Sequence, residues 1–173
     1  MQDALFVFVL ASSTIGYTTP AIAGRLTVLP LPEDVHYAIR KSSTRSLKRW
    51  IAWDRTTLDV IDPESGRTPM MTALINEKHN HFKIWLESGA QLDVTDGAGN
   101  SALQVAAPIN EPWQVLALLQ AGANPRLRNS QSQALQRNLF MTPRNSLNSD
   151  TCKGMDAAVL WLRDHGLESQ PKN

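Results

Sequence analysis

The chain lacks the features that would lock it covalently, attract a polyanion or hold it across a membrane. Only one of its 173 residues is cysteine, Cys152, so no internal disulfide is possible. Basic residues never occur more than two in a row and the net charge is +1, which argues against nucleic acid as a partner. The apolar run at residues 5–11 is far shorter than the ~20 residues that a membrane-spanning helix needs.

The motifs of common enzyme classes are missing as well. The sequence has no Gly-rich phosphate loop, no Gly-x-Ser-x-Gly nucleophile elbow and no zinc-ligand spacing. We therefore expect no catalytic residues, no cofactor and no bound metal. The length of the chain fits one domain.

What the chain does contain is a segment that nearly repeats itself thirty-three residues later. It reads Gly-Arg-Thr-Pro-Met-Met-Thr-Ala from Gly66 and Gly-Asn-Ser-Ala-Leu-Gln-Val-Ala from Gly99. A second glycine pair, Gly89 and Gly122, has the same offset. A fixed period of this length is typical of stacked small units, none of which can bury its apolar face alone. Such stacks usually act by contact with another protein.

Each unit carries the signals of two short helices. Thr68 and Pro69 predict a helix start, because a hydroxyl caps free N–H groups and proline fits the first helical turn. Apolar residues spaced i, i+3 and i+4 predict one apolar stripe on each second helix, formed by Phe82, Trp85 and Leu86 and again by Val115, Leu118 and Leu119. Gly89 and Gly122 follow these stripes, where a helix end favours a left-handed residue.

These residues resemble ankyrin repeats, whose pattern is a turn with Gly, Thr-Pro-Leu opening a helix, an Ala pair, a second apolar helix and Gly-Ala. The second unit, residues 62–94, matches at Gly66, Thr68, Pro69, Met70, Ala73, Leu74, Phe82, Trp85, Leu86, Gly89 and Ala90. The third unit, residues 95–127, matches at Gly99, Ser101, Ala102, Leu103, Ala106, Ala107, Val115, Leu118, Leu119, Gly122 and Ala123. The resemblance implies an all-α solenoid of helix–turn–helix units that binds proteins.

Two weaker units flank this pair and bring the predicted number of repeats to four. The first covers residues 33–61, with a first helix over residues 33–40 that turns Val35, Ala38 and Ile39 inward. The fourth covers residues 128–168 and includes a polar insertion at residues 142–154. Within it, Gln133-Ala134-Leu135-Gln136 aligns with Ser101-Ala102-Leu103-Gln104. A polar tail, residues 169–173, follows. End repeats are expected to be atypical, because each has one face in water.

The N-terminus differs in character from the repeats. Residues 5–11 are continuously apolar, residues 12–20 are small and polar, and Ala21-Ile22-Ala23 precedes Gly24. This order resembles a secretory signal peptide at residues 1–23 with an Ala-x-Ala cleavage site, followed by a linker at residues 24–32. We therefore expect a periplasmic or secreted protein. The alternative is an intracellular adaptor whose apolar N-terminus packs on the first repeat.

Histidine, cysteine and aspartate side chains offer chemical roles that compete with structural ones. His79 and His81 lie at the start of a predicted helix, where residues two apart point about 200° apart, so turn packing is favoured over a metal site. Cys152 and His165 belong to the same terminal unit, but no pattern positions them as nucleophile and base. The acids near the hairpins fit hydrogen bonding within turns, and they are Asp62, Asp93 and Asp96.

The five tryptophans recur on or beside the second helices. Trp50, Trp85 and Trp161 match the spacing of the apolar stripe and are predicted to pack in the core. Trp53 and Trp113 fall off the stripe, so we predict that they lie at the surface.

The face that would bind a partner follows from the family resemblance. In an ankyrin stack the hairpin tips and first helices line a concave side. On this side we predict as partner-binding residues Arg67, Met71, Ile75, Asn100, Gln104, Gln136 and Arg137. Met71 and Ile75 are expected to form an exposed apolar pair beside the charge of Arg67. The insertion at residues 142–154 is a second candidate surface.

The function that follows is non-catalytic binding of a protein partner by a chain that is a monomer when free. Small exported ankyrin proteins include some that resemble immunity proteins. Others in that group support a neighbouring enzyme. The resemblance therefore leaves two roles open: the chain neutralises a partner such as a toxin or effector by covering it, or it assists its partner. An enzyme that uses His79, His81 or Cys152 is a third hypothesis.

Overall fold

The computed structural model describes residues 35–41 and 43–167, with the backbone alone for Tyr37, Ala38 and Gln136. Outside these residues lie the predicted signal peptide at 1–23, the linker at 24–32, the helix start at Glu33 and the tail at 169–173. The predicted inward direction of the Ala38 side chain also falls outside the described part.

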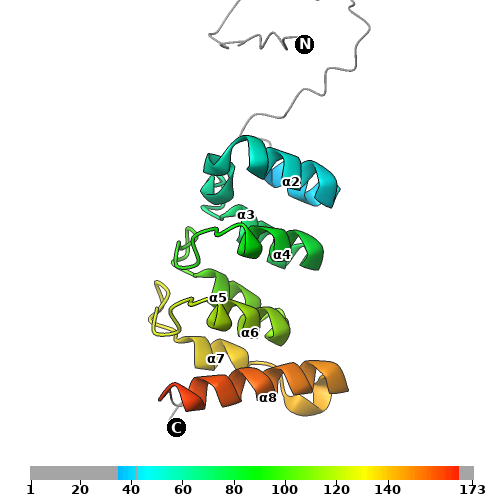
Figure 1. Ribbon diagram of the computed structural model, residues 1–173. Helices are drawn as coiled ribbons and strands as arrows, with labels where there is room; N and C mark the ends of the chain where they lie inside the picture. The colour runs from blue at the N-terminus through cyan, green and yellow to red at the C-terminus, as the bar shows by residue number, and fades with distance from the viewer. Residues whose placement is uncertain (1–34, 42, 168–173) are drawn as a thin grey trace, which may run out of the picture.

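The regular elements of the described residues are helices, arranged as one stack of helix pairs (Figure 1). The pairs are α1 (Val35–Lys41) with α2 (Thr44–Trp53), α3 (Pro69–Ile75) with α4 (His79–Glu87), α5 (Ala102–Ala106) with α6 (Pro112–Gln120), and α7 (Leu135–Leu139) with α8 (Ser149–Asp164). Two short 3-10 helices, η2 (Arg55–Asp59) and η3 (Arg144–Ser146), follow α2 and precede α8. The predicted all-α solenoid of about four helix–turn–helix units is confirmed.

Local sequence sets where these helices begin. The Thr68 hydroxyl accepts a hydrogen bond from the Met71 N–H at 3.3 Å, and Pro69 opens α3 as predicted. At the start of α8 the Asn148 side chain accepts a hydrogen bond from the Thr151 N–H at 2.7 Å. Because this cap starts the helix at Ser149, the second half of the predicted insertion at residues 142–154 is helical.

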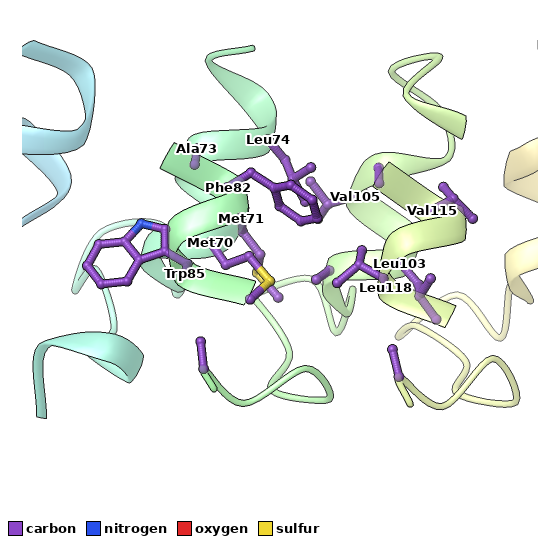
Figure 2. Close-up of a cluster of buried hydrophobic side chains, with 14 of the residues drawn as sticks. Met70, Met71, Ala73, Leu74, Phe82, Trp85, Leu103, Val105, Val115 and Leu118 are labelled. Carbon is purple, nitrogen blue, oxygen red and sulfur yellow. The ribbon is translucent and has the colours of Figure 1, made fainter. Parts of the chain in front are cut away.

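Apolar contacts between neighbouring pairs hold the stack together. First helices pack on first helices, in the order α1, α3, α5 and α7, while α2 packs on α4 and α6 packs on α8. Figure 2 shows part of this core, to which α3, α4, α5 and α6 all contribute side chains. Trp85 and Leu118 are each 0% exposed. Burying one large apolar side chain contributes roughly 1.5–3 kcal/mol, and part of that burial is supplied by the adjacent unit.

The last pair is closed by α8, a helix of 16 residues that packs on α6. Gly154 faces this contact, since a Cβ added there would lie 3.0 Å from Pro112 and 3.1 Å from the Trp113 ring. The Trp113 indole N–H donates to the Asp150 carboxylate at 3.0 Å. Gly154 therefore allows the close approach of α8 to the third repeat, and the hydrogen bond from Trp113 holds α8 there.

The hairpins are stabilised by side chains that accept hydrogen bonds from their own turns. Asp62 accepts from the N–H of residue 64, and Asp96 accepts from the N–H groups of residues 98 and 100. Asn129 takes the same role in the next hairpin, accepting from the N–H groups of residues 131 and 133. The predicted turn bonding of Asp62 and Asp96 is confirmed.

Neighbouring hairpins are joined through their backbones. The Gly97 N–H donates to Ser65 O at 3.2 Å, and one repeat further the Ser130 N–H donates to Ala98 O at 3.1 Å. Gly66 adopts a φ of 67°, and a Cβ at this position would lie 2.6 Å from the Gly97 nitrogen. Glycine is therefore required here both for the left-handed backbone and for the close approach of the next hairpin.

Carboxylates also join one repeat to the next. Asp59 accepts a hydrogen bond from the Gln91 N–H at 2.8 Å, and Asp93 accepts one from the Asn124 N–H at 2.9 Å. Asp93 thus bonds backbone near a turn, as predicted, although the backbone belongs to the following repeat. Each of these bonds exists only while two adjacent repeats are folded.

The tryptophans divide between core and surface largely as predicted. Trp50 and Trp85 are buried, at 9% and 0% exposure, whereas Trp53 and Trp113 are exposed, at 65% and 43%. Trp161 packs against the core but is only half-buried, and its ring stacks on His165 with 3.7 Å between the ring centroids.

Two buried histidines lie where the first helix pair meets the second. His36 of α1 is 5% exposed and contacts Thr72 Oγ1 through Nδ1 at 2.8 Å. Its Nε2 lies 3.0 Å from Val60 O, so Nε2 carries the proton of the neutral ring and donates to this carbonyl. His81 of α4 is 6% exposed, and its Nδ1 has no hydrogen-bond partner in the described residues.

Burial is the largest cause acting on both rings, and it lowers the pKa of His36 and of His81. Around His36 the Val60 carbonyl and Asp62 act in the opposite direction, and near His81 the charge of Lys78 adds to the lowering. The folded chain therefore binds fewer protons than the unfolded chain just below the ordinary histidine pKa of about 6.5, and stability is lost as the pH falls through that value.

The first prediction concerns tryptophan burial. Trp85→Ala should lower the free energy of unfolding by roughly 3–5 kcal/mol, because it leaves a cavity in the shared core. Trp53→Ala, at an exposed position, should change it by less than about 0.5 kcal/mol. Urea unfolding followed by circular dichroism measures both, and equal effects of the two substitutions would contradict the assignment of core and surface.

The second prediction concerns pH. The urea midpoint of the wild type should fall between pH 7 and pH 5, a window above the ordinary range of the carboxylates. His36→Gln removes one titrating group and should show a smaller fall over the same window. A fall of the same size in both proteins would show that His36 does not carry the effect.

Candidate functional site

The hairpins and first helices of the second to fourth repeats line a groove of about 530 Å³. Its lining residues recur at the repeat period of thirty-three. One side of the groove, at the hairpin end of the first helices, is formed by Arg67, Asn100 and Gln133 and is called the polar side below. The opposite side, at the other end of these helices, is formed by Ile75, Pro108, Ile109 and Met141 and is called the apolar side.

The polar side is a row of amides that begins with one cation. Asn100 Oδ1 accepts a hydrogen bond from Asn129 Nδ2 at 2.9 Å, and the same Nδ2 donates to Gln133 Oε1 at 3.1 Å. Arg67 stands at the end of this row, and its buried Nε has no hydrogen-bond partner in the described part of the chain. The amides are thus held in place by one another, whereas the guanidinium is not.

The apolar side exposes side chains that a solvated surface would not favour. Ile75 is 38% exposed, Ile109 is 37% exposed and Met141 is 62% exposed. Pro108, in register with Ile75 and Met141, is partly exposed between them. Each of the three repeats therefore contributes at least one apolar group to the groove, which is the arrangement expected of a surface that meets another apolar surface.

The floor of the groove is largely buried and contains two amide side chains. Val105 is 8% exposed and Gln104 is 3% exposed. Asn138 of α7 lines the groove at 5% exposure, so only a small part of its side chain reaches the solvent there. An occupant that covered the Asn138 amide would have to offer it hydrogen bonds in place of water.

Charge in the groove is unevenly placed. Among the described residues that line it, Arg67 is the one cation and Asp96 the one acid. The Asp96 carboxylate accepts hydrogen bonds from the N–H groups of Ala98 and Asn100 and from Asn100 Nδ2. Asp96 is thus engaged within its own hairpin, and the Arg67 guanidinium sets the charge that a ligand would meet.

Four of the predicted partner-binding residues line this groove, namely Arg67, Ile75, Asn100 and Gln104. Met71 does not, because it is 1% exposed and packs in the core, so the predicted exposed pair of Met71 with Ile75 is wrong. Because α3 packs on α1, α4 and α5, Met71 is buried with the other residues of Pro69–Leu74, whereas Ile75 ends the helix and is partly exposed.

Gln104 is also buried, contrary to the predicted exposure, and its amide is already used. Its Oε1 accepts from the Ser101 N–H at 3.0 Å, while its Nε2 donates to Leu127 O at 3.2 Å and to Gln133 O at 2.9 Å. Gln104 therefore ties α5 to the next hairpin and supports the groove rather than contacting a partner.

In the fourth repeat the predicted register was off by one residue. The residue that precedes the first helical turn is Ala134, equivalent to Ser101, so Arg137 corresponds to Gln104. Arg137 is exposed but does not line the groove. The side chain of Gln136, also predicted to bind, is outside the described part of the chain. The groove residues that were missed here are Gln133, Asn138 and Met141, and adding thirty-three to Asn100, Val105 and Pro108 finds them.

The histidines considered as metal ligands face different surroundings. His79 is exposed and lies 2.7 Å from Gln114 Nε2 and 3.7 Å from the Glu111 carboxylate, whereas His81 is buried. Burial raises the pKa of Glu111 more than His79 lowers it. In the described residues no group of three or more His, Cys, Asp or Glu side chains is arranged to hold a metal ion.

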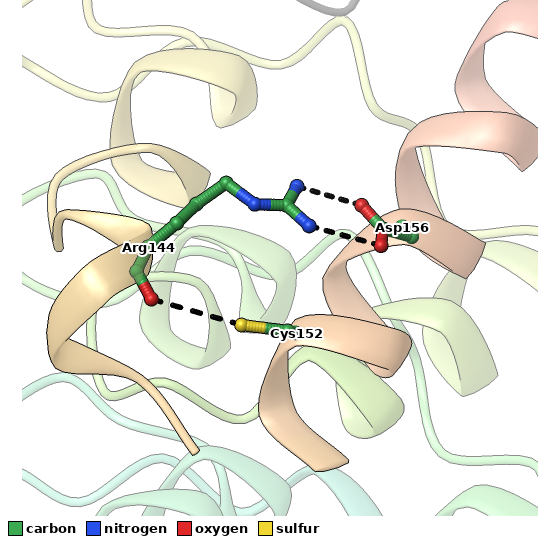
Figure 3. A network of polar contacts seen from close by, with 3 residues as sticks. All are labelled: Arg144, Cys152 and Asp156. Carbon is green, nitrogen blue, oxygen red and sulfur yellow. Dashed lines mark hydrogen bonds and ion pairs between the residues drawn. The ribbon is translucent and has the colours of Figure 1, made fainter. Parts of the chain in front are cut away.

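Cys152 and His165 are not brought together. They lie at opposite ends of α8, about 20 Å apart for a helix of this length. Figure 3 shows what surrounds the thiol instead: Cys152 Sγ lies 3.8 Å from Arg144 O, and the Arg144 guanidinium pairs with Asp156 through two contacts of 2.7 and 3.0 Å. Hydrogen bonds from Arg144 lower the pKa of the Asp156 carboxyl. This cluster fastens η3 to α8.

The stack of helix pairs and the residues that repeat at thirty-three have a match among known families. The family model for ankyrin repeats, in three copies, matches residues 35–129. The chain belongs to the ankyrin repeat family. The fourth helix pair, α7 with α8, continues the stack beyond the matched residues.

A solved ankyrin structure supports the same fold. The chain is similar to the ankyrin repeat domain of Bcl-3, a member of the IκB protein family, with a TM-score of 0.57 and 22% sequence identity. The similarity covers 71% of this ankyrin chain and 49% of the Bcl-3 chain, so this chain spans about half the length of that domain. No curated protein sequence matches the chain. Within the described residues, none of the helices has the length and apolarity needed to cross a bilayer.

The third prediction tests the corrected position of Met71. Met71→Glu should destabilise the protein by more than about 2 kcal/mol, because it places a carboxylate in the apolar core. Arg67→Glu, on the polar side of the groove, should cost less than about 1 kcal/mol. Thermal unfolding of the two variants gives the comparison. A well-folded Met71→Glu variant would restore the idea of an exposed pair.

Proposed function

We propose that the chain is a protein-binding module without catalytic activity, and that its groove receives a segment of the partner. The observation that carries this proposal is the apolar side of the groove, where Ile75, Ile109 and Met141 are 37–62% exposed in successive repeats. Apolar groups between polar ones are the anatomy of a protein interface, with a centre that excludes water and a rim that stays wet.

The rigidity of the stack supports the same proposal. The groove floor belongs to the buried core, and Gln104 ties it to the next hairpin by two hydrogen bonds. The partner would therefore meet a surface that is already ordered, and little conformational entropy would be lost on this side of the complex. Ankyrin repeats form a family of non-enzymatic interaction scaffolds, which agrees with a role in binding proteins.

We propose further that the protein acts in the periplasm as an immunity-type protein. The order of apolar, polar and Ala-x-Ala residues at positions 5–23 supports export. An exported module that covers a toxin or effector would inhibit it by occlusion. N-terminal sequencing of the mature protein separates this proposal from an intracellular adaptor, since cleavage after Ala23 would leave Gly24 as the first residue.

The fourth prediction tests the groove as the binding surface. A double variant, Ile109→Asp with Met141→Asp, should lose the partners that the wild type captures from a periplasmic extract, because two carboxylates would be placed against apolar groups. The matched control is Leu160→Asp on α8, which is 47% exposed and lies outside the groove. Captured proteins are identified by mass spectrometry.

Each outcome of this capture bears on the proposal. Proteins lost from the groove variant and retained by the control support it, provided that both variants unfold at the wild-type temperature. Equal capture by all three proteins would refute the groove as the binding site. If a captured partner is toxic on co-expression, protection by the wild type and by the control but not by the groove variant supports the immunity role.

A further inference from the structure

The charge, apolar side chains and amides of the groove indicate the chemistry of its occupant. We propose that its occupant is an extended segment of about six residues, with a carboxylate facing Arg67, apolar side chains against the apolar side and one peptide unit paired with Asn138. This inference rests on the proposed function and narrows it to a class of partner sequence.

The carboxylate follows from Arg67. Arg67 is the one cation among the described lining residues, it forms no ion pair with any of them, and its Nε is buried without a partner. A cation that has no ion-pair partner in the groove favours an occupant of opposite charge. A carboxylate suits the guanidinium best, because two parallel hydrogen bonds and opposite charge act together. The nearby acid, Asp96, is held by its own hairpin.

The extended backbone follows from Asn138. Its amide offers one acceptor oxygen and two donor hydrogens, which match the N–H and C=O of a single peptide unit. In a bound helix those backbone groups are already paired within the helix, so an Asn138 amide covered by it would lose water and gain no partner. An extended segment leaves its N–H and C=O free and pairs with Asn138 directly.

The length follows from the repeats that hold the two polar anchors. Arg67 precedes α3 and Asn138 lies in α7, and α3 packs on α5, which packs on α7. Two helix-packing steps of ~8–10 Å each give a separation of ~16–20 Å. An extended chain rises ~3.3 Å per residue, so about five or six residues span the two anchors.

The spacing of apolar side chains follows from the apolar side of the groove. Each repeat presents an apolar group at the same register, in the order Ile75, Pro108 and Met141, at helix-packing steps of ~8–10 Å, and Ile109 lies next to Pro108. A polyproline II segment has three residues per turn and rises ~3.1 Å per residue, so every third side chain points the same way ~9 Å apart. Apolar residues three apart in the partner sequence therefore match the three repeats.

The fifth prediction tests this chemistry with peptides. Random peptides of about twelve residues are displayed and selected on the full chain. We expect enriched sequences to share an Asp or Glu and apolar residues three apart. The affinity of the most enriched peptide, measured by fluorescence anisotropy, should fall at least about tenfold for Arg67→Glu and for Asn138→Leu, and stay unchanged for the Leu160→Asp control.

The decisive test exchanges the charges of Arg67 and of the acidic residue in the selected peptide. Replacing the acidic residue of the selected peptide by Lys should abolish binding to the wild type and restore it with Arg67→Glu. Enriched peptides without an acid, unchanged affinity for Arg67→Glu, failure of the exchange, or helix formation on binding seen by circular dichroism would each overturn the inference. Thermal unfolding of every variant at the wild-type temperature excludes loss of fold as the cause.

Failure here is distinguishable from failure of the proposed function. If no peptide is enriched, the extended occupant is refuted. The comparison of the Ile109→Asp, Met141→Asp double variant with Leu160→Asp in partner capture still decides whether the groove binds folded proteins.

Discussion

The structure depends on one constraint: no helix pair of this chain has enough apolar neighbours of its own to stay folded alone. Trp85, Leu103 and Leu118 are buried in one core that runs through adjacent pairs. The hairpins add a polar counterpart, since Asp59 and Asp93 each accept a hydrogen bond from the following repeat. Stacking therefore fixes the relative position of the first helices, and with it the shape of the groove.

Much of this architecture was predictable from the sequence, because the signals are local and periodic. Thr68 with Pro69 marks a helix start in any context, and the stripe from Phe82 to Leu86 indicates one buried helix face. The assignment of individual side chains on α3 and α5 was not predictable to the same degree. These helices have 7 and 5 residues and are packed between neighbouring helices, so nearly all of their side chains are buried. Met71 and Gln104, predicted to contact a partner, are buried for that reason.

The fourth repeat shows why register fails where capping chemistry is missing. Ala134 has no side-chain oxygen to mark the helix start, whereas Thr68 marks one clearly. The sequence therefore pairs Gln133 with Ser101, although Ala134 is its structural equivalent. This error places Arg137 one position beyond its true equivalent, Gln104. Asn138 and Met141 were missed although the period alone finds them. The repeat period is thus a better guide to the groove than similarity of residue type, because backbone spacing persists after side chains have diverged.

The hydrogen bonds that Asp59 and Asp93 accept from the following repeat also affect how the chain opens. A bond such as that from the Gln91 N–H to Asp59 is lost when either repeat opens, so neighbouring units are expected to open cooperatively rather than one at a time. The groove is formed by three consecutive repeats. A partner segment bound across all three would therefore oppose the local unfolding of any one of them. Occupancy would then slow amide hydrogen exchange well beyond the contact surface and lengthen the lifetime of the chain among proteases.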